Sequence, residues 1–546
     1  MDRPTKLLAT GIALLALLIA ACAPPTAEEA GVDAETDDDA DAPADPAPDD
    51  DTDPDTDDTD DTEEASAPGD VLVAARTGDV DNLDPHMATA FQTVQTLGQI
   101  YETLFESDSE LQIVPGLAED HVFADDGMSL ELTIAEGVTF HDGSDLSADD
   151  VVASLERVLD EDSGAVGGAN LASVESIEAP DDTTVVLGLS KQDATLPAAL
   201  ANLNTAIAPA EHIESGDIST EPVGTGAFVY DDWTQGDVFR TTAFDDYRLG
   251  APAIDGVEFR VVPDEPSVVA GLQADQYDFG VLTDPLVVAD IDEGALEVER
   301  APSLSYRVLQ LNTEVEPLDD EAVRQAIACT VDRDEVIASA LLGEGEVTGP
   351  FTSPAYDLDP YLGLPCDGPD PDLGQELLDG AGHGDGFSLE TIVMTGGYAT
   401  AVNEAQSVQA QLSAIGIDLE LETLETNVYV DRWMEADYDV AVALNGGNSD
   451  PHLMYNRYFT SDGNFQSVAT HATDELDELF VAGEGETDED ARTEIYTEIA
   501  EHLGEASPWV WMAQGFEYWV HQPEVSGFVG HPTGSLRGLR DVSLDS

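Results

Sequence analysis

The sequence has little positive charge and almost no lysine. Lysine occurs only at Lys6 and Lys191, and lysine and arginine together number 17 against 116 acidic residues, a formal net charge of −99. Nucleic-acid backbones are bound by clustered lysine and arginine side chains. A nucleic-acid partner is therefore excluded by composition.

The acidity extends along the whole chain. About 95 of the acidic residues lie beyond residue 68, against 15 of the basic ones. Repulsion among so many like charges is tolerable where dissolved salt screens it. We therefore expect a salt-rich habitat, which says more about the host than about the activity.

Cysteine and the usual catalytic motifs are also scarce. The chain has three cysteines, and it contains no CxxC, HExxH or GxSxG pattern. Thioredoxin-like, zinc-protease and serine-hydrolase chemistry thus lack their usual residues. These absences weigh against those three classes of enzyme.

No apolar run is long enough to span a bilayer. The run from Leu7 to Ile19 is shorter than the roughly 20 residues required, follows Arg3 and Lys6, and predicts a signal peptide over residues 1–21. Residues 19–22 resemble a bacterial lipobox, which implies cleavage before Cys22 and a lipid on its sulfur. The alternative is an ordinary signal peptide followed by an incidental cysteine.

Residues 22–68 predict a disordered acidic tether between this anchor and the body. The segment from Ala27 to Pro68 holds about twenty acids, no base and no apolar periodicity. Such a chain cannot bury enough surface to offset its ordering entropy. Calcium binding by the run DTDPDTDDTDD is the alternative, although the glycine and distant glutamate of a calcium loop are missing.

The body alternates strand-like and helix-like segments. Residues 71–75 and 130–140 have strand patterns, and residues 93–104 have apolar side chains at helical spacing. The class is therefore α/β. His141 and Asp142 precede a turn and have no second metal ligand or nucleophile nearby, so we interpret them as structural.

Several long stretches resemble the family 5 extracellular solute-binding proteins, the receptors of importers for dipeptides, oligopeptides and nickel. They are residues 114–159, 221–228, 245–280, 311–337 and the pair 450–451, and they occur in the family's order from about residue 70 to the C-terminus. Several long matches in the correct order are far more specific than one short motif.

The resemblance implies an α/β, two-lobed periplasmic-binding-protein fold with a hinge and an extra domain. Lobe I would comprise residues 69–104, 222–302 and 517–546, the inserted domain 105–221, and lobe II 303–516. The lobes would close over a peptide or another small solute. No bond would be made or broken, so the resemblance implies no catalytic residue, no metal, no cofactor and a protein that is not an enzyme.

The expected partners are the permease and ATPase subunits of an ABC transporter. The protein would be a monomer on the outer face of the cytoplasmic membrane, held there by lipid on Cys22. The alternatives are a solute-sensing receptor without a transporter and, in a different class, a lipoprotein enzyme on the same fold.

The family's ligand-contacting segments map onto four places in this chain. The implied residues are Thr89, Ala90, Phe91, Gln310, Asn312, Trp433, Asn445, Gly446, Gly447, Asn448 and Asp450. The chain departs from the pattern because the family's ammonium-binding aspartate falls on Gly447. A buried ammonium without a carboxylate is costly, so a neutral, N-blocked or larger solute is expected. Asp450 could replace the missing carboxylate or cap local structure.

Cys329 and Cys366 are the two cysteines of the body. Disulfides persist in an exported protein, so we expect these two residues to pair. Two buried thiols are the alternative.

Overall fold

The computed structural model describes residues 70–351, 358–395 and 398–544. The predicted signal peptide, Cys22 and the acidic tether lie outside the described residues. Within the described ranges, no helix combines the length and apolar character needed to cross a membrane.

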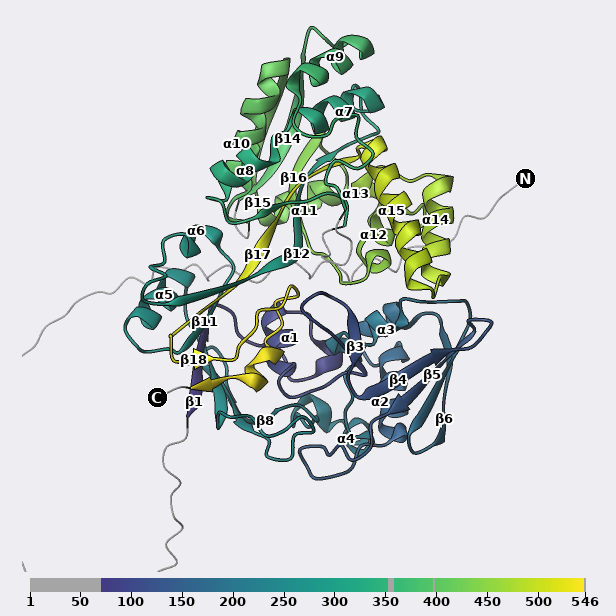
Figure 1. The fold of residues 1–546 in the computed structure, drawn as a ribbon, viewed down its shortest axis with the longest axis vertical. Coiled ribbons are helices and arrows are strands. Elements are labelled where there is room, and N and C mark those ends of the chain that lie inside the picture. Colours follow the sequence, from purple (N-terminus) through teal and green to yellow (C-terminus); the bar gives the residue numbers. More distant parts are fainter. Residues whose placement is uncertain (1–69, 352–357, 396–397, 545–546) are drawn as a thin grey trace, which may run out of the picture.

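One large mixed sheet runs through both halves of the molecule (Figure 1). Its strands follow the order β15-β14-β16-β12-β17-β11-β1-β10-β9-β8, and β13 pairs with β17 beside this path. The bounds are β1 Val71–Arg76, β8 Phe228–Thr234, β9 Val238–Ala243, β10 Gly256–Val261, β11 Phe279–Leu282, β12 Glu297–Leu311, β13 Glu346–Val347, β14 Phe387–Thr395, β15 Ile417–Glu425, β16 Val440–Asn445 and β17 Trp509–His521.

The long antiparallel strands β12 and β17 form a ribbon that connects the two halves (Figure 1). Glu297 pairs with His521 at the lobe I end, and Gln310 pairs with Trp509 inside lobe II. The register shifts between Pro302 and Tyr306, which interrupts the regular ladder midway. The fold is thus two-lobed, as predicted, with this ribbon as the hinge.

Lobe I packs around β1, which is parallel to β10 and β11. Its helices are α1 Phe91–Leu97, α5 Glu265–Gln273 and α6 Pro285–Val288, and the short strands β18 Val525–Ser526 and β19 Ser543–Leu544 pair near its C-terminus. The predicted helix over residues 93–104 is wrong beyond Leu97. Residues 98–100 form a turn, and the carbonyl oxygens of Gln99 and Ile100 accept the backbone N–H groups of Phe228 and Gly226 instead of continuing the helix.

Residues 105–221, which were predicted as an inserted domain and are called by that name below, contain a separate four-stranded sheet in the order β4-β5-β7-β6. The elements of the inserted domain are β2 Phe105–Ser107, β3 Ile113–Pro115, β4 Ala118–Phe123, β5 Ser129–Ile134, α2 Ala148–Leu159, β6 Val174–Asp181, β7 Thr184–Leu189, α3 Leu196–Ala199 and α4 Ala210–Ser215. A separate apolar core fills it. Leu203, Ala206, Ala208 and Ile218 pack into the core of lobe I, so the two units share a packed interface.

His141 and Asp142 are structural, as predicted. His141 Nε2 lies 2.9 Å from the Gly226 carbonyl oxygen, and the Gly224 N–H donates to Nδ1 at 3.4 Å. Asp142 accepts from Ser144 and closes the following turn. His141 thus joins the inserted domain to the glycine loop of lobe I.

Lobe II holds the largest apolar core of the described chain. Its helices are α7 Glu321–Thr330, α8 Arg333–Ala340, α9 Pro371–Ala381, α10 Ala401–Leu412, α11 Thr426–Met434, α12 Pro451–Phe459, α13 Gln466–Ala469, α14 Asp474–Gly485 and α15 Glu489–Ala506. A disulfide links Cys329 of α7 to Cys366, 37 residues later.

Candidate binding site

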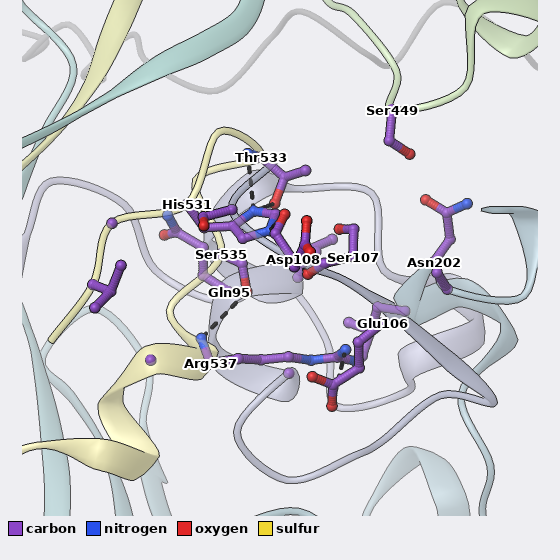
Figure 2. A pocket seen from close by; sticks show the side chains of 18 of the residues that line it. Gln95, Glu106, Ser107, Asp108, Asn202, Ser449, His531, Thr533, Ser535 and Arg537 are labelled. Carbon is purple, nitrogen blue, oxygen red and sulfur yellow. Dashed lines mark hydrogen bonds and ion pairs between the residues drawn. The ribbon is translucent and has the colours of Figure 1, made fainter. Parts of the chain in front are cut away.

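A cleft of about 320 Å³ opens between lobe I, the inserted domain and lobe II. Its walls come from α1, the β2–β3 turn, the segment after α3, and the C-terminal segment 529–540, while Ser449 enters from lobe II (Figure 2). The lining residues discussed below are Phe91, Gln95, Glu106, Asp108, Ser449, His531, Thr533, Arg537 and Arg540. Segments that are far apart in the sequence therefore build one site.

Helix α1 supplies one apolar and one polar group to this cleft. Phe91 begins the helix and is 38% exposed. One turn later, Gln95 donates from Nε2 to the Gly534 carbonyl oxygen at 2.8 Å. Its buried Oε1 has no hydrogen-bond partner among the described residues. An amide so placed can accept a hydrogen bond from a solute.

A compact charge cluster forms the floor of the cleft (Figure 2). Arg540 donates from both Nη atoms to Glu106, at 3.2 Å each, and Arg537 lies 3.7 Å from the same carboxylate. Burial by itself raises the pKa of Glu106, but the charges of Arg537 and Arg540 outweigh it and lower the pKa below its usual value. The Glu106 carboxylate is therefore ionised and paired with these two arginines.

His531 fixes one edge of the cleft. Its Nδ1 lies 2.7 Å from Thr533 Oγ1, and its Nε2 lies 3.0 and 2.8 Å from the carbonyl oxygens of Ser107 and Asp108. Burial lowers the pKa of His531, which favours the neutral ring. The histidine thus ties the C-terminal segment to the β2–β3 turn.

Of the three predicted lobe I residues, Phe91 is among the residues that line the cleft, and Thr89 and Ala90 are not. Phe91 lines it directly, and Ala90 caps the start of α1. Thr89 is exposed immediately before the helix. The structure therefore keeps this segment beside the site, with Phe91 as the contact residue.

Three of the predicted lobe II residues do not line the cleft. Trp433 Nε1 donates to Gln310 Oε1 at 2.5 Å, and both side chains are buried in lobe II. Asn312 is also buried, and its Nδ2 donates to the carbonyl oxygens of residues 436 and 438 at 3.1 and 2.9 Å. These contacts hold the three side chains inside lobe II, and their expected contact with the ligand stays a prediction.

The predicted loop after β16 reaches the cleft through a residue that sequence reasoning missed, Ser449. Asn445 is buried at the strand end, and the Gly446 carbonyl oxygen accepts from Arg457 Nη2 at 2.8 Å. Asn448 Oδ1 accepts from the backbone of Asp450 at 3.0 Å. The loop is therefore held by its own hydrogen bonds.

Gly447 and Asp450 have local structural roles. A Cβ atom on Gly447 would lie 2.1 Å from the Leu304 carbonyl oxygen of the hinge ribbon, so the backbone leaves no space for a side chain. Asp450 caps α12 by accepting from the His452 N–H, and it pairs with Arg492 at 2.8 Å. Of the two roles considered for Asp450, the structure supports the cap.

Other cleft residues were also missed. The segments 198–203 and 529–540 carry no spacing that marks a binding site, although HPTGS at residues 531–535 has the composition of a turn. Among the described residues, no group of three or more histidine, cysteine, aspartate or glutamate side chains is arranged to hold a metal ion.

Proteins named for the solute that they bind align with most of this chain. The glutathione-binding protein GsiB of Salmonella paratyphi A is 25% identical over 491 residues, which cover 85% of this chain and 92% of that protein. The oligopeptide-binding protein AppA of Bacillus subtilis is 26% identical over 501 residues, with coverage of 86% and 91%. Both relatives are named for the solute that they bind.

A solved structure shares the fold. HbpA2 from Haemophilus parasuis aligns with a TM-score of 0.79 at 24% identity, covering 87% of this chain and all of that one. The family model described as "Bacterial extracellular solute-binding proteins, family 5 Middle" matches residues 112–467. With this match over more than half of its length, the chain belongs to the family 5 bacterial extracellular solute-binding proteins.

Proposed function

We propose that this protein captures a small solute between its lobes outside the cytoplasm and delivers it to the permease and ATPase subunits of an ABC transporter. The observation that carries the proposal is the cleft, which is lined by lobe I, the inserted domain and Ser449 of lobe II and lies beside a two-stranded hinge. Closure of such a hinge removes a solute from water and presents a new surface to a membrane partner.

The proposed solute is a peptide or a related small molecule without a free ammonium anchored at Gly447. The tight approach of Leu304 to Gly447 leaves no space for the carboxylate that would pair with such an ammonium. Polar contacts would come from Gln95, from Ser449 and from backbone groups, with Phe91 as an apolar face. Each neutral hydrogen bond contributes only about 0.5–1.5 kcal/mol, so affinity needs several of them together with apolar contact.

The protein is proposed to act as a monomer held on the outer face of the cytoplasmic membrane by lipid on Cys22. The support is the apolar run that ends in Ala20, Ala21 and Cys22. An acidic tether of residues 22–68 would let the body move away from the membrane surface.

The direct test is to identify what the protein holds. We expect mass spectrometry of small molecules released from protein purified in molar salt to find one solute class at near-stoichiometric amounts. Calorimetry with free and N-acetylated di- to pentapeptides should show micromolar binding of the N-acetylated set. A protein that retains no solute and binds neither set would contradict the proposed function.

A further inference from the structure

One face of the hinge ribbon carries two charged side chains, Arg307 of β12 and Glu517 of β17. The Ser303 hydroxyl donates to Glu517 Oε1 at 2.6 Å. A Cβ on Gly515 would lie 2.6 Å from Arg307 Nη1, so the guanidinium lies over the space that this glycine leaves open. Ser303, Arg307, Gly515 and Glu517 therefore share one face of the ribbon.

This face adjoins the cleft through Gly534. A Cβ on Gly534 would lie 2.2 Å from Phe91 Cζ and 3.2 Å from Glu517 Oε2. Phe91 lines the cleft, and Gly534 also accepts a hydrogen bond from the cleft residue Gln95. The ribbon face thus continues the cleft wall towards lobe II.

One nitrogen of the Arg307 guanidinium is hydrogen-bonded within the protein, and the other two are not. Its Nε donates to Glu404 Oε1 at 3.2 Å, and the two side chains are only 9% and 0% exposed. Glu404 also accepts the hydroxyl groups of Thr400 and Tyr398, which fix the carboxylate. Arg307 Nη1 and Nη2 have no hydrogen-bond partner among the residues that the structure describes.

Two free Nη groups on a nine-tenths buried arginine form a preorganised anion site. Guanidinium Nη groups bind a carboxylate through two parallel hydrogen bonds, which are shorter and stronger than neutral ones. Neither Nη atom is among the buried polar atoms that lack a partner, so both remain accessible from the solvent side and a solute can reach them.

We propose that Arg307 is a specificity-determining residue that binds a carboxylate group of the solute through Nη1 and Nη2. This inference rests on the proposed function, because it assigns the solute class of the same cleft. The site lies on the hinge ribbon, so a carboxylate bound there contacts the element that bends when the lobes close.

The acidic neighbours of Arg307 do not prevent carboxylate binding. Glu404 is engaged by Nε, Thr400 and Tyr398. Burial raises the pKa of Glu517, an effect that the Ser303 hydrogen bond and the Arg307 charge partly offset, and this limits the negative charge beside an incoming anion. The carboxylate of Glu346, on the strand that pairs with β17, accepts a hydrogen bond from Gln514 Nε2 at 3.3 Å.

The test compares N-acetylated tetrapeptides that have a free C-terminal carboxylate with the same peptides as C-terminal amides. Calorimetry uses the full exported chain in molar salt. We expect the acids to bind the parent protein about 10- to 100-fold more tightly than the amides. Arg307→Gln should remove this preference, and Arg307→Lys should keep part of it.

Arg432→Gln is the matched arginine control, because Arg432 lies on α11 and pairs with Glu390 and Glu422 at the surface. It should leave the preference for acids unchanged. Arg307→Gln strips the buried Glu404 of its cation. If that variant does not fold, the double variant Arg307→Gln, Glu404→Gln tests the same loss of preference.

Two results would overturn the inference while leaving the proposed function intact. One is equal affinity of acids and amides for the parent, and the other is an undiminished preference for acids in Arg307→Gln or the double variant. Failure of the parent to bind either peptide set would instead defeat the peptide class of the proposed function, and the inference would fall with it.

Discussion

Lys191 of the inserted domain and Glu484 of lobe II form an ion pair across the interlobe gap. Lys191 Nζ lies 2.6 and 2.8 Å from the two carboxylate oxygens, and the nearby Ala194 N–H donates to the Glu484 carbonyl oxygen at 2.7 Å. Helix α14, which carries Glu484, lies away from the ribbon (Figure 1). The lobes thus meet at the hinge and again at this contact.

We predict that Lys191→Gln shifts the protein towards an open form. Exposed ion pairs contribute only up to about 1 kcal/mol, and Lys191 is more than half exposed, so the shift should be small and should shrink as salt rises. Small-angle scattering at low and molar salt measures it through the radius of gyration. Lys191→Arg should behave like the parent, and an unchanged radius for Lys191→Gln at low salt would refute the prediction.

Gly447→Asp should destabilise the protein and create no peptide binding. The added Cβ would meet the Leu304 carbonyl oxygen at 2.1 Å, and forcing backbone apart in a packed region costs roughly 1–3 kcal/mol. Thermal unfolding and calorimetry with free peptides measure the two effects.

Gly446→Asp is the matched control, because no atom lies within 4 Å of a Cβ at Gly446. It adds the same carboxylate one residue away and should leave stability nearly unchanged. If Gly447→Asp is as stable as Gly446→Asp and binds free peptides, the steric argument is wrong.

Cys329 and Cys366 should appear as one linked peptide after non-reducing digestion of the exported protein. The link closes a loop of 37 residues, and such links typically stabilise by about 2–4 kcal/mol. The double variant Cys329→Ala, Cys366→Ala should therefore unfold at a lower temperature than the parent. Two freely alkylated thiols in the exported protein would contradict this pairing.

Cys22→Ser should release the protein from the membrane fraction. The lipid proposed on Cys22 is the only anchor that the sequence indicates. Fractionation of cells that express the parent or the variant, followed by detection of the body, measures this release. A variant that stays with the membrane would show that another element holds the protein there.

His141 should make the protein sensitive to acid. Burial lowers the pKa of His141 from 6.5 to about 4, with the hydrogen bond to Gly226 and the charge of Asp142 acting in the opposite direction. Protons then bind preferentially to the unfolded chain, so the stability contributed by the neutral ring is complete above pH 6.5 and is lost as pH falls towards 4.

His141→Asn should unfold at a lower temperature at pH 7, because it loses the ring contact with Phe244, and its unfolding midpoint should fall less between pH 6.5 and 4. Thermal scans at constant molar salt across this range measure both quantities. His121→Asn, at an exposed position, should keep the pH dependence of the parent. A His141 variant with the pH dependence of the parent would refute the assignment.

Local signals in the sequence predicted local structure well. Ser147 and Asp150 have the spacing of a helix capping box, and the Asp150 carboxylate accepts the Ser147 backbone N–H at 2.9 Å at the start of α2. His141 and Asp142 were correctly interpreted as a turn scaffold. The ordered matches along the body indicated the family and the two-lobed fold. The first two features depend on residues close together in the sequence. The third depends on long stretches whose order can be read from a single sequence.

Only the tertiary structure decided which side chains reach the cleft. Gln310 was expected to touch the ligand, but a strand in the middle of a sheet is buried on both faces, and its sequence does not show which face adjoins a cleft. Trp433 lies on α11 and donates to Gln310, a contact between distant segments that no local pattern indicates. Gly447 could be recognised as a missing carboxylate, whereas the carbonyl oxygen that excludes any side chain there belongs to Leu304, which lies far away in the sequence. The free Nη groups of Arg307 likewise depend on Glu404, 97 residues later, which binds Nε alone. Composition and local patterns determined the class of this protein, and contacts between distant segments determined its site, because a binding cleft exists only where those segments meet.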